Sequence, residues 1–338
     1  MVYKCSSCGS CMIYDFKEKT LTCPSCSQSN PPEPVSDNLD DVEICPVCGG
    51  SLSLGRYGTA VKCGYCDSFN VIASRLSGEA EPSAIVPTFM SRKHMFELLR
   101  EKFSRYLCII PEAFSESRLK EVIIEYVPYW VYHFGIRASF NGEIRTSKTT
   151  GNTTVTDTYA VRIVTDLGLS NVPVDASDLM PDEIMDDLEP FDLKTALPFK
   201  IEQLSGSNSE RFNHDAEFYK EEAACKASSQ AYDYIYEDLM KRYPHATNLS
   251  ERTIRDHTDL NITTLDIRYF LLPVYKYSYT FHSGRVLDYY VNGQTEEVWG
   301  TAPISKPRLI LAVAATILLF SGVASIVTTI LMAIGGAL

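Results

Sequence analysis

The chain has 338 residues, a length that allows two or three compact units. Apolar residues make up 45% and charged residues 22%, which excludes a wholly disordered chain and a polytopic membrane protein. The 31 basic residues stand against 43 acidic ones and give a formal net charge of -12. This balance argues against a protein that binds nucleic acid by neutralising phosphates, because such binding needs a basic face.

The first 66 residues contain nine of the eleven cysteines, and eight of these nine follow a repeated pattern. Two Cys-x-x-Cys pairs separated by fourteen residues occur twice, the second time with an offset of 40. Such pairs are typical of a tetrahedral zinc ribbon, in which two tight turns each present two thiolates to one ion. The eight candidate ligands of two structural Zn²⁺ ions are Cys5, Cys8, Cys23, Cys26, Cys45, Cys48, Cys63 and Cys66.

Alternatives to zinc differ in how well they suit this segment. A rubredoxin-like iron site uses the same ligands and stays open, whereas disulfides are disfavoured by the expected cytosolic location and by the doubled spacing. We interpret Cys11, which has no counterpart in the second repeat, as a packing residue rather than a fifth ligand. Four protein thiolates per ion leave no position for a substrate, so the sites are expected to support folding and recognition. Two loaded sites would bring the net charge to about -16.

The predicted organisation runs from two small ribbons through a larger domain to a membrane anchor, and the predicted fold class is α+β. We expect zinc ribbon 1 at residues 1–30, a stiff polar linker at 31–39, zinc ribbon 2 at 40–74, a cytosolic α+β domain with antiparallel strands at 75–305, and the anchor at 306–338.

Within the larger domain, apolar residues from Met95 to Tyr106 recur at helical spacing, and Pro111 ends that helix or starts the next element. Aromatic and β-branched runs follow, in which Asn141–Gly142 signals a hairpin turn, and residues 153–165 also read as a strand. Residues 163–193 carry nine acidic side chains and no Lys or Arg, which favours an exposed acidic loop region over a calcium site. A helix is expected over residues 209–243, with Phe218, Ala224, Tyr232, Ile235 and Leu239 among its apolar positions.

The C-terminal thirty residues, 309–338, contain no charged side chain. Twelve Leu, Ile, Val or Phe residues lie between Leu309 and Ile330, and a helix of thirty residues would span roughly 45 Å. A buried core helix is the alternative, but such a helix usually keeps a polar stripe. Lys306 and Arg308 precede the span and no basic residue follows it, so the N-terminal part is expected in the cytosol, without a secretory signal. The sequence thus predicts a single-pass, tail-anchored protein of the cell membrane.

No catalytic set is evident in the sequence. The six histidines show no metal-protease spacing, and the chain has no nucleophile elbow, phosphate-binding loop or dinucleotide fingerprint. His214–Asp215 reads as a solvated helix start, and Cys108 and Cys225 as packing thiols. We therefore predict a protein that is not an enzyme and has no small-molecule substrate.

Several stretches together resemble a family of bacterial double zinc-ribbon membrane proteins of the "TFIIB-type zinc ribbon" class. The resemblance rests on the paired Cys motifs and on residues 85–87, 126–132, 204–206, 271–275, 291–295 and 300–304. Some members are found with phage-shock (PspA-like) and SPFH-domain membrane-stress proteins, so the resemblance implies an adaptor that places such partners at the cytosolic leaflet. Glu296–Glu297 and the additional Cys11 depart from the family pattern.

The resulting hypothesis is a non-enzymatic, membrane-tethered scaffold or sensor that docks proteins through its ribbons and contacts the lipid bilayer. The alternative is a membrane-associated nucleic-acid-binding or transcription-linked zinc-ribbon protein, which the acidic charge makes the weaker hypothesis. An enzyme hidden in the larger domain is a third hypothesis, and it would require a pocket with convergent polar groups.

Overall fold

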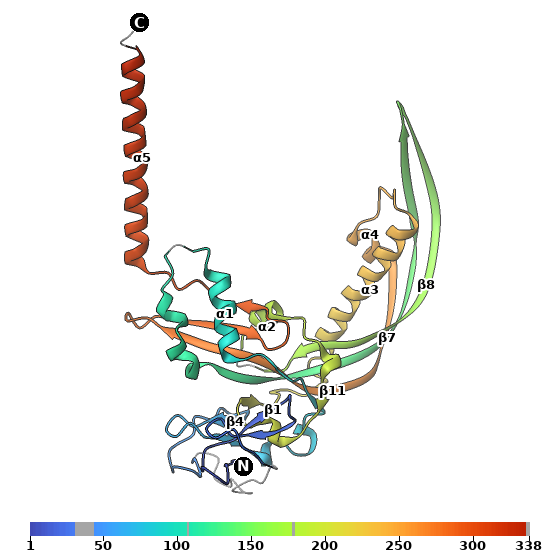
Figure 1. Ribbon diagram of the computed structural model, residues 1–338. Helices are drawn as coiled ribbons and strands as arrows, with labels where there is room; N and C mark the ends of the chain where they lie inside the picture. Colours follow the sequence, from blue (N-terminus) through green and yellow to red (C-terminus); the bar gives the residue numbers. More distant parts are fainter. Residues whose placement is uncertain (31–43, 107, 178–179, 336–338) are drawn as a thin grey trace. The chain divides into compact units, whose positions relative to one another are not determined.

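The computed structural model describes residues 1–30, 44–106, 108–177 and 180–335 (Figure 1). The predicted linker at 31–39 lies outside the described residues, as do residues 40–43 of the predicted second ribbon. The chain divides into two compact units, and each unit is assembled from three separate segments. Unit 1 comprises Met1–Pro87, Tyr126–Asp182 and Asp192–Leu272, and unit 2 comprises Thr88–Glu125, Glu183–Phe191 and Pro273–Leu338.

Both cysteine-rich segments lie in unit 1 but join different sheets. The first segment forms a separate antiparallel sheet of β1 (Ile13–Asp15), β2 (Thr20–Thr22) and β3 (Ser29–Asn30). The second contributes the antiparallel pair β4 (Gly58–Lys62) and β5 (Phe69–Val71), and β4 also pairs with β10 (Asn208–Glu210) of the large sheet. Short pieces complete this part: η1 (Ala73–Arg75), η2 (Gly78–Ala80), β6 (Ala84–Ile85), η5 (Leu193–Thr195), β9 (Leu197–Pro198) and η6 (Ile201–Leu204).

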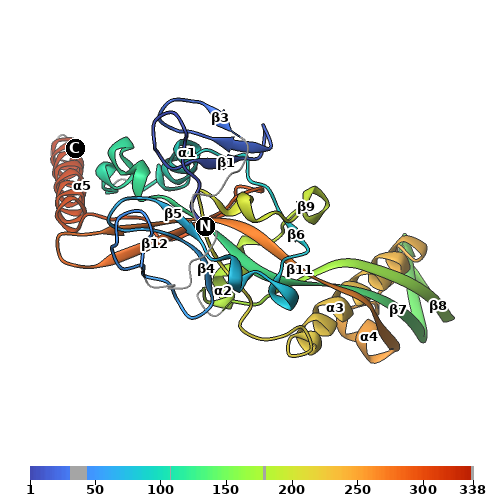
Figure 2. The same cartoon turned by 90° about the horizontal axis from the view of Figure 1, so that it is seen from below.

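Long strands and one long helix form the remainder of unit 1. The strands are β7 (Ile123–Thr150), β8 (Thr153–Asp175) and β11 (Thr258–Thr280), and the helices are α3 (Lys220–Arg242) and α4 (Glu251–Asp256). Figures 1 and 2 agree in placing α3 and α4 along one side of β7 and β8. The buried stripe of α3 repeats every four residues and consists of Ala223, Ala227, Ala231, Ile235 and Leu239. Its three alanines allow the helix to pack closely against the strands.

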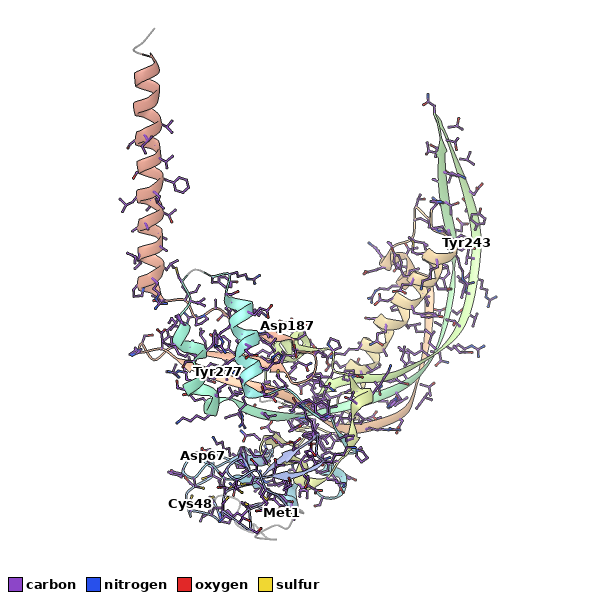
Figure 3. All side chains as sticks on the ribbon, viewed as in Figure 1. Met1, Cys48, Asp67, Asp187, Tyr243 and Tyr277 are labelled. Carbon is purple, nitrogen blue, oxygen red and sulfur yellow. The ribbon has the colours of Figure 1, made fainter. Side chains whose placement is uncertain are left out.

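Unit 2 packs helical pieces around an aromatic core on strands that belong to the large sheet. Its elements are α1 (Arg92–Phe103), η3 (Pro111–Phe114), η4 (Glu116–Glu121), most of α2 (Asp182–Leu188), the C-terminal part of β11, β12 (Val286–Asn292), β13 (Val298–Trp299) and α5 (Lys306–Gly335). The ring of Phe96 lies 4.9 Å from that of Tyr277, which Figure 3 labels, and the Phe114 ring lies 5.2 Å from that of Tyr289. Edge-to-face contacts of this kind add to the stability gained from burial.

The predicted mixture of helices and antiparallel strands is confirmed, although the short β6 pairs in parallel with β11. The helix expected after Met95 is α1, and Met95, Leu99 and Phe103 are buried as the periodicity predicts. Pro111 begins the next element, η3, where its fixed φ suits the first helical position.

The predicted hairpin turn at Asn141–Gly142 is wrong. The strand β7 runs without interruption to Thr150, and the turn follows at Gly151, whose φ is +63°. A Cβ at position 142 would lie 3.0 Å from the Phe140 ring and 3.3 Å from the His257 ring. The glycine therefore serves close packing rather than a turn, a distinction that an Asn-Gly pair cannot reveal by itself.

The expected acidic loop at residues 163–193 is also wrong. The strand β8 continues to Asp175, and in α2 the side chains of Ile184, Met185 and Leu188 are buried. Acidic residues such as Asp186 and Asp187 occupy the exposed positions between these apolar ones. The charges thus mark the solvent-facing side of regular elements, and the pattern of the intervening apolar residues was the informative signal.

The helix expected over 209–243 begins eleven residues later, at Lys220. Ser209 instead belongs to β10, and the backbone N–H of Phe218 donates to Asp215 Oδ1 at 3.1 Å, just before the helix. Phe218, expected among the apolar positions of this helix, precedes α3 and is 63% exposed, whereas Ile235 is buried.

Candidate metal centres

The structure brings the eight cysteines of the Cys-x-x-Cys motifs together in two groups of four. In each group the sulfur atoms all lie within 4.8 Å of one another. In the first group Cys5 Sγ lies 3.6 Å from Cys26 Sγ, and Cys8 Sγ lies 3.4 Å from Cys23 Sγ. In the second, the corresponding distances, Cys45–Cys66 and Cys48–Cys63, are 3.7 Å and 3.8 Å.

These distances match the edges of a tetrahedron around one metal ion. A zinc–thiolate bond of about 2.3 Å requires neighbouring sulfurs of a regular tetrahedron to lie about 3.8 Å apart. A disulfide would require about 2.0 Å, and all eleven cysteines are free thiols. Each cluster could therefore hold one metal ion with four protein ligands.

The four Cys-x-x-Cys pairs share one backbone conformation. In the turn that begins at Cys5, the Cys5 carbonyl accepts from the N–H of Gly9 at 2.9 Å, and the Cys5 N–H donates to the carbonyl of Ser10 at 2.8 Å. The same two bonds recur, at 2.8 to 3.0 Å, in the turns that begin at Cys23, Cys45 and Cys63. This repeated turn directs two thiols of each pair to the same point, so the local sequence builds half of each site before the chain closes it.

The residue directly after each Cys-x-x-Cys pair has a left-handed backbone. Gly9 and Gly49 have φ of +74° and +73°, as expected from the permissive backbone of glycine. Ser27 and Asp67 occupy the equivalent positions with φ of +58° and +57°. The sequence analysis did not predict the left-handed conformation of Ser27 and Asp67, because neither residue type by itself indicates it. Their position directly after a Cys-x-x-Cys pair, equivalent to that of Gly9 and Gly49, could have indicated it.

The environments of the two clusters differ. In the second cluster the Ser68 hydroxyl lies 3.2 Å from Cys45 Sγ and 3.1 Å from Cys66 Sγ, and buried Asn70 approaches Cys45 Sγ at 3.7 Å. In the first cluster the position equivalent to Ser68 is Gln28, whose side chain accepts from the Ser7 hydroxyl in an exposed contact. Cys48 and Asp67, which Figure 3 labels, are both exposed.

Local hydrogen bonds favour the thiolate form that a metal requires. The hydroxyl and backbone N–H of Ser10 lower the pKa of Cys8 to about 6. Burial would raise the pKa of Cys45, but bonds from Ser68 and from backbone N–H groups outweigh it and lower that pKa to about 6. These surroundings favour the thiolates of Cys8 and Cys45, whereas contacts with the other cysteines, together with burial, outweigh the backbone N–H groups of Gln28 and Gly50 and raise the pKa of Cys26 and of Cys48 to about 12.

The remaining cysteines lie outside both clusters. Cys11 is half-buried, burial raises the pKa of its thiol, and Lys4 is its bridge partner in the first segment. Cys108 is buried in unit 2, and Cys225 is exposed on α3 rather than packed as the sequence predicted.

The second candidate functional element is α5. Its residues Lys306–Val327 form a helix that is long and apolar enough to cross a membrane, and none of this window is buried in the protein. Leu311, Leu318 and Phe320 are each more than 70% exposed, which a core helix would not allow. Within the described part of the chain, α5 is therefore not a buried core helix.

Two histidines, one in each unit, have well-defined neighbours. In unit 1, Asp215 accepts a hydrogen bond from the N–H of Phe218, and the His214 ring stacks on the Phe218 ring with 4.2 Å between their centres. Both contacts lie in the turn directly before α3. On unit 2, His94 lies 2.9 Å from Glu296 and 3.4 Å from Glu97, and the hydrogen bond with Glu296 raises the pKa of His94. This surface pairing joins residues 202 positions apart, which explains why the sequence did not indicate it.

Comparison with known proteins gives one informative match. No family model and no solved structure gives a significant match to the chain. The chain is 30% identical over 323 residues to the uncharacterized protein YdjG of Bacillus subtilis (strain 168), and the match covers 91% of each protein. At this identity and coverage, the chain belongs to the same family as YdjG.

Proposed function

We propose that this protein is a non-enzymatic adaptor, anchored in the membrane by α5, that binds two structural zinc ions and docks other proteins at the cytosolic leaflet. The observation that carries the proposal is the closure of each candidate metal centre by four thiols from two opposed turns. Four protein ligands fill a tetrahedral ion, so no position remains for a substrate or an activated water. A bound ion would supply folding energy and a rigid surface rather than Lewis-acid catalysis.

Zinc is the proposed metal because all-thiolate tetrahedral sites of this spacing suit it best, with iron as the competing ion. The sulfur separations of 3.4 to 3.8 Å accommodate either ion, so the identity must come from metal analysis. Thiolates persist without disulfide formation in a reducing compartment, which agrees with the proposed cytosolic location.

Charge at the start of α5 supports the proposed orientation. Lys306 and Arg308 lie at its first turn, and positively charged flanks are retained on the cytosolic side. Unit 1 and the part of unit 2 that precedes α5 would then remain in the cytosol, with the apolar part of α5 in the bilayer.

The proposed partners are membrane-stress proteins of the PspA-like or SPFH type, a proposal that derives from the family resemblance. A candidate anchor is Tyr65, which lies between two ligands of the second cluster and is 73% exposed. Exposed tyrosines are frequent hot spots of protein interfaces. The net charge of -12 gives no corresponding support for binding to nucleic acid.

The metal and the anchor can be tested together on the full chain purified from membranes. Elemental analysis should find two zinc ions per chain, about one in Cys5→Ser or Cys45→Ser, and two in Cys225→Ser, which removes an exposed thiol outside the clusters. Alkaline carbonate extraction should leave the chain in the membrane pellet. A chain without zinc or iron, or a chain released by carbonate, would refute the corresponding part of the proposal.

Docking requires a separate test with a variant that keeps the metal. Tyr65→Ala should retain two zinc ions yet lose a PspA-like or SPFH-type protein that co-purifies with the wild-type chain and with Cys225→Ser. Unchanged recovery of such a partner would contradict docking through the second ribbon. Salt-sensitive retention of nucleic acid instead would favour the competing function.

A further inference from the structure

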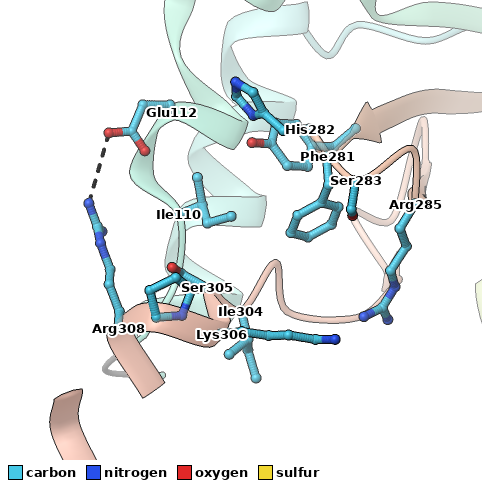
Figure 4. Close-up of a pocket in the computed structure, with 12 residues that line it drawn as sticks. Ile110, Glu112, Phe281, His282, Ser283, Arg285, Ile304, Ser305, Lys306 and Arg308 are labelled. Carbon is cyan, nitrogen blue, oxygen red and sulfur yellow. Dashed lines mark ion pairs between the residues drawn. The ribbon is translucent and has the colours of Figure 1, made fainter. Parts of the chain in front are cut away.

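A pocket of about 600 Å³ lies in unit 2 where α5 begins (Figure 4). It is formed by the loop before α5, the turn between β11 and β12, and the chain around Ile110. Because the apolar part of α5 starts at Leu309, the pocket lies within one helical turn of the predicted membrane span. Its position relative to α5 is fixed by the chain, since Lys306, Pro307 and Arg308 form part of its wall.

The polar part of the pocket is cationic in a chain that is otherwise acidic. Arg285, Lys306 and Arg308 line it, against a single carboxylate from Glu112. Arg308 is already engaged, since it lies 4.0 Å from Glu112 and donates to the carbonyl of Ile109 at 3.0 Å. Within the described part of the chain, Arg285 and Lys306 have no carboxylate partner. Figure 4 shows both of these side chains extending on the side away from the Arg308–Glu112 pair.

The rest of the wall is apolar. Phe281, Ile110 and Ile304 line the pocket, and the guanidinium of Arg285 lies 5.8 Å from the centre of the Phe281 ring. The N-terminal end of α5 adds a partial positive charge to the same space. Two unpaired cations beside an apolar surface suit a molecule with an anionic head and a hydrocarbon tail better than a free inorganic anion.

We propose that this pocket binds the phosphate group of an anionic phospholipid, such as phosphatidylglycerol or phosphatidic acid, from the cytosolic leaflet. Arg285 and Lys306 contact the phosphate, and Phe281 and Ile110 contact the glycerol and the first acyl carbons. This inference rests on the proposed membrane anchorage, because only a chain inserted through α5 brings the pocket to the level of the headgroups. The pocket would make the protein selective for anionic lipid, which the anchor by itself is not.

The test uses the full chain in a nonionic detergent, titrated with phosphatidylglycerol, phosphatidic acid or phosphatidylcholine of identical acyl chains and read by native mass spectrometry. The double variant Arg285→Gln/Lys306→Gln removes the two unpaired cations. Lys241→Gln/Arg252→Gln is the matched control, because it removes one lysine and one arginine whose side chains are 76% and 91% exposed in unit 1.

We expect tighter binding of the anionic lipids than of phosphatidylcholine. We also expect about 25-fold weaker binding in the pocket variant, since each of the two surface cations contributes about fivefold. The control should bind as the wild type does. Equal affinity for all three lipids, or an unchanged pocket variant, would overturn the proposal. Competition by inorganic phosphate alone at comparable concentration would overturn it too, by identifying a soluble anion as the ligand.

Carbonate extraction of the same proteins separates this inference from the anchor. A pocket variant that stays in the membrane pellet but loses lipid selectivity supports the pocket. A wild-type chain that stays in the pellet without selectivity refutes the pocket and leaves the anchor intact. Release of the wild-type chain by carbonate refutes the anchor, and the lipid site with it.

Discussion

The two cysteine-rich segments share a backbone conformation but are joined to unit 1 in different ways. The first forms its own three-stranded sheet, in which β1 is only half-buried. The second contributes β4 and β5 to the large sheet, and all but one residue of these strands is buried. The Lys62 N–H even donates to the side chain of Asn208, 146 positions away. The same local motif has thus become a peripheral module in one copy and a part of the sheet in the other.

The first segment is attached through contacts at Met1 and beside Ser205, and the Met1 carbonyl accepts from the N–H of Val71, in β5, at 2.9 Å. The N–H of Tyr14 donates to the Ser205 carbonyl at 2.8 Å, and the Ser205 hydroxyl donates to the carbonyl of Met12 at 2.8 Å. Beside them, Gly206 lies against Ile13. The Leu204–Gly206 stretch, which the sequence indicated only as part of a family resemblance, is therefore one site at which the first segment is attached.

The largest predicted effect follows from losing the metal in each segment. Cys45→Ser should lower the free energy of unfolding of unit 1 by more than about 4 kcal/mol, because the second site supports the large sheet. Cys5→Ser should release its metal while leaving that sheet intact. Hydrogen exchange measured by mass spectrometry should show faster exchange throughout β4, β5 and β10 for the first variant. For the second variant the faster exchange should be limited to residues 1–30, the amide of Val71, which donates to the Met1 carbonyl, and the 204–207 loop.

Cys225→Ser, which removes a thiol remote from both clusters, should leave the exchange pattern unchanged. If Cys5→Ser also released β4 and β5, the two segments would depend on each other, and the contrast between a peripheral and an integrated module would be lost.

A second prediction concerns the contact between Gly206 and Ile13, where the first segment is attached. Gly206 has a φ of +112°, and a Cβ there would lie 2.4 Å from Ile13 Cγ2, so Gly206→Ala should cost about 3 kcal/mol. Gly78→Ala is the matched control: its φ is +67° but nothing lies within 4 Å, so only about 1 kcal/mol of backbone strain is expected. Thermal unfolding measures both costs.

The double variant Gly206→Ala/Ile13→Ala separates the steric part of this cost from the backbone strain. It should be more stable than the sum of the two single changes predicts, because the truncated side chain leaves room for the new methyl group. If the stability changes of the two single variants simply added in the double variant, the first segment would not be attached through the contact of Ile13 with Gly206.

The third prediction compares the side chains around the thiols. Ser68→Ala removes a hydroxyl next to two sulfurs of the second cluster and should weaken metal binding there by at least about tenfold. Gln28→Ala, at the equivalent position of the first cluster, removes only an exposed contact with Ser7 and should leave the affinity nearly unchanged. Competition with a chromophoric chelator measures both affinities, and equal losses would contradict the different surroundings assigned to the two sites.

Features encoded within a short stretch could be predicted from the sequence. The Cys-x-x-Cys spacing indicated the eight grouped thiols, and the uncharged C-terminal stretch indicated an exposed apolar helix. The periodicity after Met95 indicated α1. In each case the physical cause acts within a short stretch of the chain. The cause is the tight turn for the thiols, the uninterrupted apolar composition for α5, and the repeating buried face for α1.

Features that depend on contacts between residues far apart in the sequence could not be predicted. Nothing near Lys62 predicts that its strand lies beside β10, and Gly142 looks like a turn residue until the His257 ring beside it is known. The strand β7 could continue past Gly142 because β8 and its neighbours supply the hydrogen bonds. The predicted boundaries at residues 30, 39, 74 and 305 stay predictions.

The smallest predicted effect tests whether the four turns are equivalent. Ser27→Gly should stabilise the metal-bound first segment by about 0.5–1 kcal/mol, because glycine adopts the left-handed conformation at φ of +58° without strain. Asp67→Gly should gain less. Aspartate tolerates this conformation better than serine, and the substitution also removes the ion pair of Asp67 with Lys62 at 2.8 Å. Denaturant titrations of the zinc-loaded proteins, with Gly9→Ala and Gly49→Ala as destabilising controls, measure the series. A gain at position 67 as large as that at position 27 would mean that the ion pair and the aspartate side chain contribute nothing to that turn, and that the two segments differ only in what surrounds them.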